Sequence, residues 1–245
     1  MKRSSVLSNL AMFALLLLCI YGWNAFDENT IIRIAIVLIA ALSIFTRYYY
    51  RYVQYLFDKL SFIAVDRCKA EEAFSLLKRV EKADIFCRLK PEIFEIKCLL
   101  YVDMDDKEEA EAFYSTARNE KKANPERELS LMCSRLFHSY FQNKGKKEFN
   151  KEYQELKNLK NKKTELNTGI CHMIEAMHSF VNNNYANAGK QLKEIEESSL
   201  NNREKSYYHY LCSLAKGKDS SFSGTEKEMA METGSGIPLL RRLCR

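Results

Sequence analysis

The chain has 245 residues, of which 47% are apolar and 29% charged, so it is long and apolar enough to bury a core. Its eight glycines and three prolines are fewer than half of the usual share of about 12%. So few turn formers and helix breakers predict an all-α fold and argue against a β-sandwich, a Rossmann domain or a collagen-like fibre.

The net charge of +6 is divided evenly between two parts of the chain. Residues 1–51 hold five basic and two acidic side chains, which leaves 33 basic and 30 acidic ones for 52–245. Because the charges of 52–245 nearly cancel, this part is predicted to have a mixed, solvated surface and no nucleic-acid interface. The eight cysteines include no C-x-x-C pair, so we interpret them as buried thiols in a reducing compartment rather than as a disulfide framework.

Two apolar runs open the chain. Residues 6–26 carry no charge and would span about 31 Å as a helix, which matches the hydrocarbon core of a bilayer. After a short polar stretch, a second run covers 31–50, with tyrosines at its end that suit the membrane interface. Arg33 is expected to snorkel to the headgroups or to Asp27 and Glu28. We therefore expect a transmembrane hairpin over 1–51 rather than a cleaved signal peptide or a buried hairpin of a soluble core.

Charges beside the two runs predict their orientation. Lys2 and Arg3 precede the first run. Arg47 and Arg51 follow the second run, whereas the connecting loop holds only acidic charges. Because positive flanks stay on the cytoplasmic side, the sequence predicts a multi-pass protein of the cell membrane with both termini in the cytoplasm.

Residues 52–216 have the apolar spacing of amphipathic helices and a recurring pattern. Four polar helix starts align at Ala73, Ala110, Asn150 and Ala188, with spacings of 37, 40 and 38 residues, and a fifth start is expected near Ala230. The expected partner helices lie between these starts, at 52–66, 91–103, 125–143, 164–182 and 201–216.

The clearest of these units resembles the tetratricopeptide (TPR) family of paired antiparallel helices. Its residues match that family's aromatic and small positions at Phe94, Cys98, Tyr101, Ala110, Tyr114 and Ala117. The unit before it offers Phe57, Leu60, Ser61, Ala64 and Ala73 in the same register. The usual glycine is Cys98 or Ser61, the late proline is absent, and the period is longer than 34 residues. The resemblance implies a TPR-like α-solenoid over 52–216, with an irregular helical bundle as the alternative.

A solenoid of this kind implies an extended concave face that holds a peptide or a partner helix. In the register of the resemblance, Glu92, Glu95 and Leu99 lie on this inner face and form the candidate partner surface. The competing interpretation of these three residues is ordinary solvated charge and core. We therefore expect a membrane-anchored, non-enzymatic scaffold or adaptor for a protein partner on the cytoplasmic side; a regulatory subunit of a larger membrane assembly is an alternative.

One cluster suggests chemistry. Cys171, Glu175 and His178 share a helix face at i, i+4 and i+7, and His138 on the preceding partner helix would supply a fourth metal ligand. However, the spacing matches no zinc signature, and no phosphate-binding loop or hydrolase motif occurs. We expect no cofactor and keep a metal- or thiol-dependent enzyme or sensor as an alternative from another class.

Residues 217–245 are expected to form a linker rich in glycine and serine, followed by a short C-terminal helix. Its leucines, Leu239, Leu240 and Leu243, alternate with arginines. We expect this helix to cap the end of the solenoid, with docking on an anionic membrane surface as the alternative.

Overall fold

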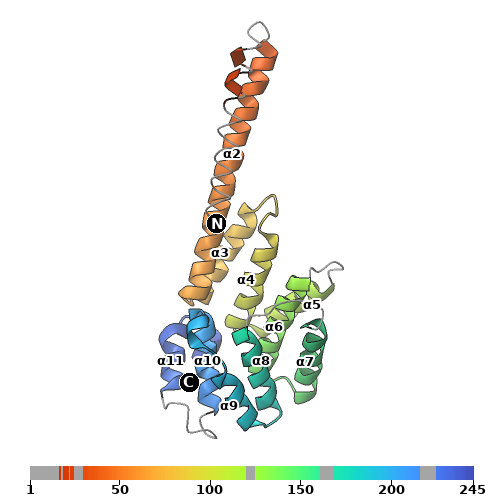
Figure 1. Ribbon diagram of the computed structural model, residues 1–245, viewed down its shortest axis with the longest axis vertical. Coiled ribbons are helices and arrows are strands. Elements are labelled where there is room, and N and C mark those ends of the chain that lie inside the picture. Colours follow the sequence, from red (N-terminus) through yellow and green to blue (C-terminus); the bar gives the residue numbers. More distant parts are fainter. Residues whose placement is uncertain are drawn as a thin grey trace. The chain divides into compact units, whose positions relative to one another are not determined.

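The computed structural model describes residues 17, 19–21, 23–24, 30–119, 125–160, 168–215 and 225–245 (Figure 1). All regular elements among these residues are helices, so the predicted all-α class is confirmed for them. The chain divides into two compact units, Met1–Tyr55 and Leu56–Arg245. The boundary lies four residues beyond the predicted one and falls inside a helix.

The first unit contains most of helix α2, Thr30–Ser61. With the π-helical turn η1, Phe62–Asp66, it forms one continuous stretch that is long and apolar enough to cross a membrane, with a mean hydropathy of 2.0 over its most apolar window. Its apolar side chains are exposed, as Ile31 and Leu42 illustrate. The predicted run 31–50 is therefore helical.

The helix does not stop where the apolar run ends. We expected a separate partner helix over 52–66, but α2 continues without a break to Ser61. This stretch contains no glycine or proline, and the hydroxyls of Ser43 and Thr46 bond to carbonyls four residues earlier, at 2.8 and 2.7 Å. Nothing local interrupts the helix.

The first apolar run lies mostly outside the described residues. Within 6–26, residues 17, 19–21, 23 and 24 are described and are helical. The guanidinium of Arg33 lies 4.8 Å from the ring centre of Trp23 and donates to the Trp23 carbonyl at 3.2 Å.

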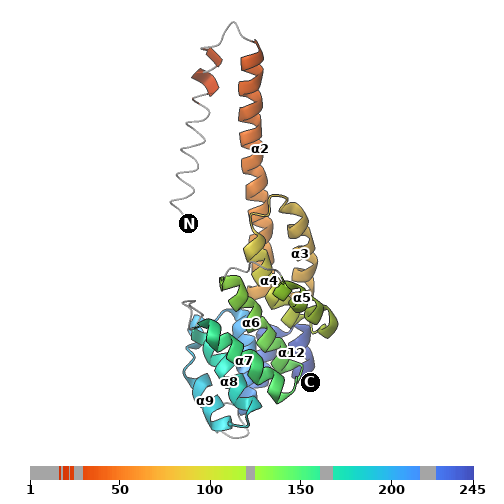
Figure 2. The ribbon, with the colours of Figure 1, turned by 90° about the vertical axis from the view of Figure 1, so that its right-hand side faces the viewer.

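The second unit is a succession of packed helices (Figure 2). After η1 they are α3 Ala70–Ala83, α4 Lys90–Asp103, α5 Lys107–Asn119, α6 Pro125–Phe141, α7 Lys146–Lys160, α8 Thr168–Val181, α9 Tyr185–Lys193, the 3-10 turn η2 Glu197–Ser199, α10 Asn202–Ala215, α11 Glu226–Gly234 and α12 Pro238–Leu243. The expected partner helices correspond to α4, α6, α8 and α10, and the aligned starts fall in α3, α5, α7, α9 and α11.

The register of the aligned starts needs one correction. The amides of Ala73, Ala110 and Ala188 each bond to the carbonyl of the residue just before their helix, and each side chain is fully buried. In α7 the residue with the same bond and the same burial is Phe149, whose amide bonds to the Gly145 carbonyl at 3.1 Å. The sequence alignment at Asn150 is therefore one residue late.

The TPR-like positions of the clearest unit form one core. Phe94 and Cys98 of α4 pack in one cluster with Ala110, Tyr114 and Ala117 of α5. Leu131 of α6 completes the cluster, and Tyr101 packs against it. Small residues allow the two helices to approach closely, while the aromatic rings fill the space beside them.

The last helices of the second unit return to the first ones. Arg203 of α10 donates to both carboxylate oxygens of Asp103 in α4, each at 2.7 Å, and the Tyr207 hydroxyl donates to the same carboxylate at 2.7 Å. Burial lowers the pKa of Arg203, but attraction to Asp103 outweighs it and leaves this pKa above its ordinary value. The α10 helix also packs against η1, so it lies against the beginning of the unit.

The C-terminal segment makes a second connection of this kind. Gly236 accepts a bond from the Ala70 amide at 3.1 Å, and Arg241 pairs with Glu71 at 2.8 Å. Leu239 and Leu240 of α12 are buried, and α12 packs against α4. The expected C-terminal helix is thus present, but it covers the first helices of the unit instead of an open end.

Candidate functional site

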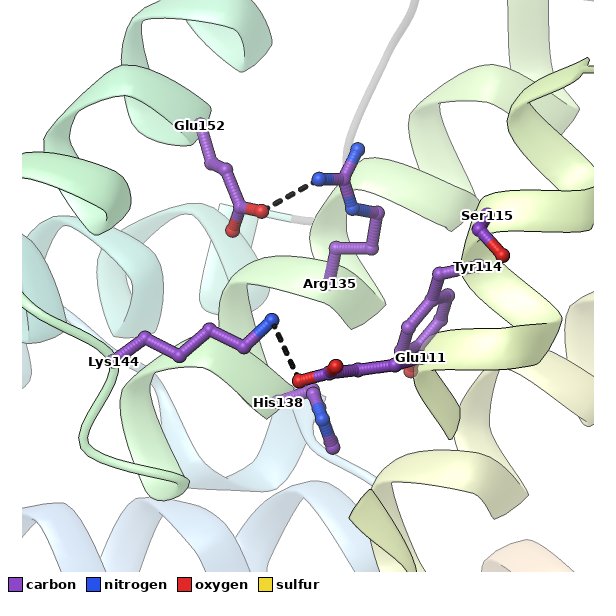
Figure 3. A pocket seen from close by; sticks show the side chains of 7 residues that line it. All are labelled: Glu111, Tyr114, Ser115, Arg135, His138, Lys144 and Glu152. Atoms are coloured by element: carbon purple, nitrogen blue, oxygen red, sulfur yellow. Dashed lines mark hydrogen bonds and ion pairs between the residues drawn. The ribbon is translucent and has the colours of Figure 1, made fainter. Parts of the chain in front are cut away.

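A polar pocket of about 310 Å³ lies between α5, α6 and α7 (Figure 3). It is large enough for a small molecule or for the side chain of a partner. Its lining residues come from all three helices and from the turn between α6 and α7; they are Glu111, Tyr114, Ser115, Arg135, His138, Lys144 and Glu152.

Two ion pairs border the pocket and balance its charge. Arg135 of α6 contacts Glu152 of α7 at 2.6 Å, and Lys144 of the turn contacts Glu111 of α5 at 3.2 Å. Figure 3 shows these pairs at two sides of the pocket, with His138 next to the second pair. Because each cation already has an anion, the pocket attracts neither sign strongly.

Three buried polar atoms of residues that line the pocket lack a hydrogen-bond partner among the described residues. They are the Tyr114 hydroxyl, Nε2 of His138 and Oε2 of Glu152. The Tyr114 side chain belongs to a residue that is 5% exposed, and His138 is 2% exposed. The ring centres of these two residues lie 5.6 Å apart. Buried polar groups without partners are rare because each costs about 1–3 kcal/mol, so these three atoms make the pocket the candidate site.

Both rings are held in their uncharged forms. Burial raises the pKa of Tyr114 well above its ordinary value. Burial, helped by Lys144, lowers the pKa of His138 from 6.5 to about 4. At neutral pH the residues that line the pocket therefore include a neutral Tyr114 hydroxyl and a neutral His138 imidazole. This combination both donates and accepts hydrogen bonds, which suits an uncharged polar group such as a carboxamide.

The predicted partner surface is divided by the fold. Glu92 and Glu95 are exposed near the start of α4, whereas Leu99 on the same face lines a small inner cavity of about 60 Å³ between α4, α6, α8 and α10. The guanidinium of Arg203 reaches the Leu99 carbonyl at 3.4 Å. Arg203 of α10 thus lies beside Leu99, and the partner surface formed by Glu92, Glu95 and Leu99 stays a prediction.

The residues considered for a metal site do not converge. Glu175 accepts a hydrogen bond from the Tyr153 hydroxyl, and His178 stacks on the Tyr153 ring with 3.9 Å between ring centres. His138 belongs to the polar pocket and faces Tyr114. Among the described side chains, no three from His, Cys, Asp and Glu lie close enough together to hold a metal ion.

All eight cysteines lie among the described residues and have free thiols. Cys68, Cys98, Cys133 and Cys212 are buried, and Cys87 is exposed. Burial raises the pKa of the Cys98 and Cys212 thiols from 9.0 to about 12, which disfavours the reactive thiolate.

Sequence reasoning missed the pocket as a site. His138 was considered as a metal ligand and Tyr114 as a packing residue, while both ion pairs went unnoticed. One signal was available: Arg135 and His138 are polar residues three positions apart in a part of α6 that also contains Leu131, Met132, Leu136 and Phe137. Polar residues that share one face of such a helix indicate a buried polar site.

Comparison with known proteins gives no further guidance, since no protein family, no curated protein and no solved structure matches this chain.

Proposed function

We propose that this chain is a membrane-anchored, non-enzymatic adaptor that binds a protein partner in the polar pocket between α5, α6 and α7. The observation that carries the proposal is the group of three buried polar atoms without partners at that pocket. A partner that inserts an uncharged polar side chain, such as asparagine or glutamine, would satisfy them. The balanced ion pairs disfavour a strongly charged ligand because its charge would have to be buried without compensation.

The anchor of this proposal is a transmembrane hairpin with spans over 6–26 and 31–50. The apolar, exposed surface of α2 supports the second span. The uncharged sequence of the first span and the basic flanks support a hairpin with both termini in the cytoplasm. This orientation predicts that a cysteine introduced by Lys190→Cys on exposed α9 reacts with an impermeant thiol reagent only after cells are opened; reaction in intact cells would contradict it.

The second unit is proposed to be TPR-like. Support comes from the cluster that joins Phe94, Cys98, Ala110, Tyr114 and Ala117, and from the recurring helix starts of α3, α5, α7 and α9. The return of α10 to α4 departs from an open solenoid. Because of this departure, we place the partner at the polar pocket and not along a concave face.

Photo-crosslinking in intact membranes tests the proposal. A crosslinking side chain at Ser115, which is exposed at the pocket, should give a discrete product with a partner, and the same group at Lys190 should not. Tyr114→Phe should reduce that product severalfold. Products that are identical at both positions, or unchanged by Tyr114→Phe, would contradict the proposed site.

Tyr114→Phe separates binding from folding. It removes a buried hydroxyl that has no partner among the described residues, so the unbound protein should be as stable as the wild type or more stable by about 1 kcal/mol. A large loss of stability would mean that the hydroxyl has a structural role.

A further inference from the structure

The turn between α3 and α4, residues 84–89, presents an exposed apolar point. Ile85 is 74% exposed and Phe86 is 65% exposed. Within the described residues of the second unit, the exposed large apolar side chains are these two and Phe62. Two adjacent side chains of this size at the tip of a hairpin are unusual for a surface that water alone covers.

Hydrogen bonds within the turn hold this tip in a defined conformation. The carboxylate of the buried Asp84 accepts the amides of Arg88 and Leu89 at 3.0 and 2.8 Å. The Cys87 amide bonds to the Asp84 carbonyl at 3.0 Å, and Cys87 adopts a left-handed backbone with φ of 52°. These bonds tie the turn to the buried Leu89 while Ile85 and Phe86 face outward, so the exposure does not come from an untethered loop.

The exposed charges within two residues of the turn are cations, while the exposed acids Glu81 and Glu92 lie one position further along the chain on either side. Lys82, Arg88 and Lys90 are exposed. The acidic residue among them, Asp84, is buried and its carboxylate is occupied by backbone amides. An apolar point with cations on both sides of it in the sequence matches the boundary between anionic lipid headgroups and acyl chains.

The tip also lies at a particular end of the second unit. The chain enters this unit at Leu56, runs to Asp66 over about 16 Å of helix, and returns through the 14 residues of α3, which span about 21 Å. The α3 helix packs against η1 and, as Figure 1 shows, runs back from it, so the 84–89 turn lies at the opposite end of α3 from η1, towards the entry of the chain into this unit. The residues that precede Leu56 belong to the helix that is apolar enough to cross a membrane.

We infer that the 84–89 turn docks on an anionic lipid surface, with Ile85 and Phe86 at the acyl boundary and Lys82, Arg88 and Lys90 at the lipid phosphates. This inference rests on the membrane anchor of the proposed function. The tip would be a second contact with the bilayer and would restrict how the second unit, with its polar pocket, is oriented over the membrane.

Tryptophan fluorescence tests this contact in the full chain, because Trp23 is its single tryptophan. The double variant Trp23→Phe, Phe86→Trp carries one tryptophan at the tip. The matched control is Trp23→Phe, Lys190→Trp, at an exposed position of α9. Both are reconstituted into vesicles of phosphatidylglycerol and phosphatidylcholine with brominated acyl chains. We expect at least threefold stronger quenching at the tip than at the control position, and a clear decrease when Lys82, Arg88 and Lys90 are changed to Glu.

The possible outcomes separate the tip from the anchor. Protein that floats with the vesicles while its tip is quenched no more than the control overturns the docking inference and leaves the anchor intact. Protein that does not float with the vesicles overturns the anchor and the docking together. A tip tryptophan that is already shielded in detergent and unchanged by vesicles indicates that another protein surface covers the tip, which also overturns lipid docking.

Discussion

The second unit contains two kinds of buried polar residue. Asp103, Arg203 and Tyr207 satisfy one another, so their burial joins α4 to α10. Tyr114 and His138 each retain a polar atom without a partner among the described residues, so their burial suits a ligand instead. Residue types alone could not separate these cases, because the deciding partners lie far apart in the chain.

Loss of the Asp103 charge should destabilise the protein strongly. Asp103→Asn leaves the Arg203 guanidinium buried without its counter-charge, and we expect a loss of about 3 kcal/mol. The control is Glu71→Gln, which breaks the exposed pair with Arg241 and should cost less than about 1 kcal/mol. Thermal unfolding of the detergent-solubilised protein measures both, and equal effects would contradict the role given to the buried pair.

Acid should destabilise the protein through His138. Its pKa is about 4 in the folded chain against an ordinary 6.5, so folding favours the neutral ring. The resulting stability is complete above pH 6.5 and is lost as pH falls towards 4. Between pH 7 and 4.5 the wild type should lose about 2 kcal/mol more than His138→Gln. Parallel pH profiles from denaturant unfolding would show that burial does not hold His138 neutral.

At the scale of elements, apolar periodicity predicted most of the second unit. The expected partner helices recur as α4, α6, α8 and α10, because one apolar face per helix is a local property. The predictions failed where the repeat spacing had to fix the alignment to a single residue, as at Phe149. They also failed where we expected the helix to be interrupted, between the apolar run and 52–66. Three turns before α5, α7 and α9 use Asp105, Asn143 and Asn183 in left-handed conformations, which helps explain how so few glycines suffice.

Gly236 should be intolerant of any side chain. A Cβ atom at this position would lie 2.3 Å from the Cys68 carbonyl oxygen, so Gly236→Ala must push the C-terminal segment away from the start of α3. We expect a loss of about 1–3 kcal/mol in thermal unfolding. Gly145→Ala is the matched control: nothing lies within 4 Å of its added Cβ, and the change should stay below about 1 kcal/mol. If Gly236→Ala left the thermal stability unchanged, this contact would not be what holds the segment in place.

At the scale of the whole chain, two properties could not be predicted from the sequence. The return of α10 and α12 to the first helices depends on contacts over about a hundred residues or more, such as Asp103 with Arg203 and Glu71 with Arg241, and no local pattern encodes them. The polar pocket depends on three helices meeting, and its charged residues look like ordinary solvated surface when each helix is considered alone. The apolar stretch that would anchor the chain, by contrast, was evident from length and charge.

Extraction of membranes with alkaline carbonate tests the central claim most directly. Cells that produce the full chain are broken, and their membranes are washed with carbonate at high pH, which strips peripheral proteins. If the apolar spans cross the bilayer, the protein should stay in the membrane pellet and be released only by detergent. Complete release into the carbonate supernatant would contradict a membrane anchor and the adaptor function built on it.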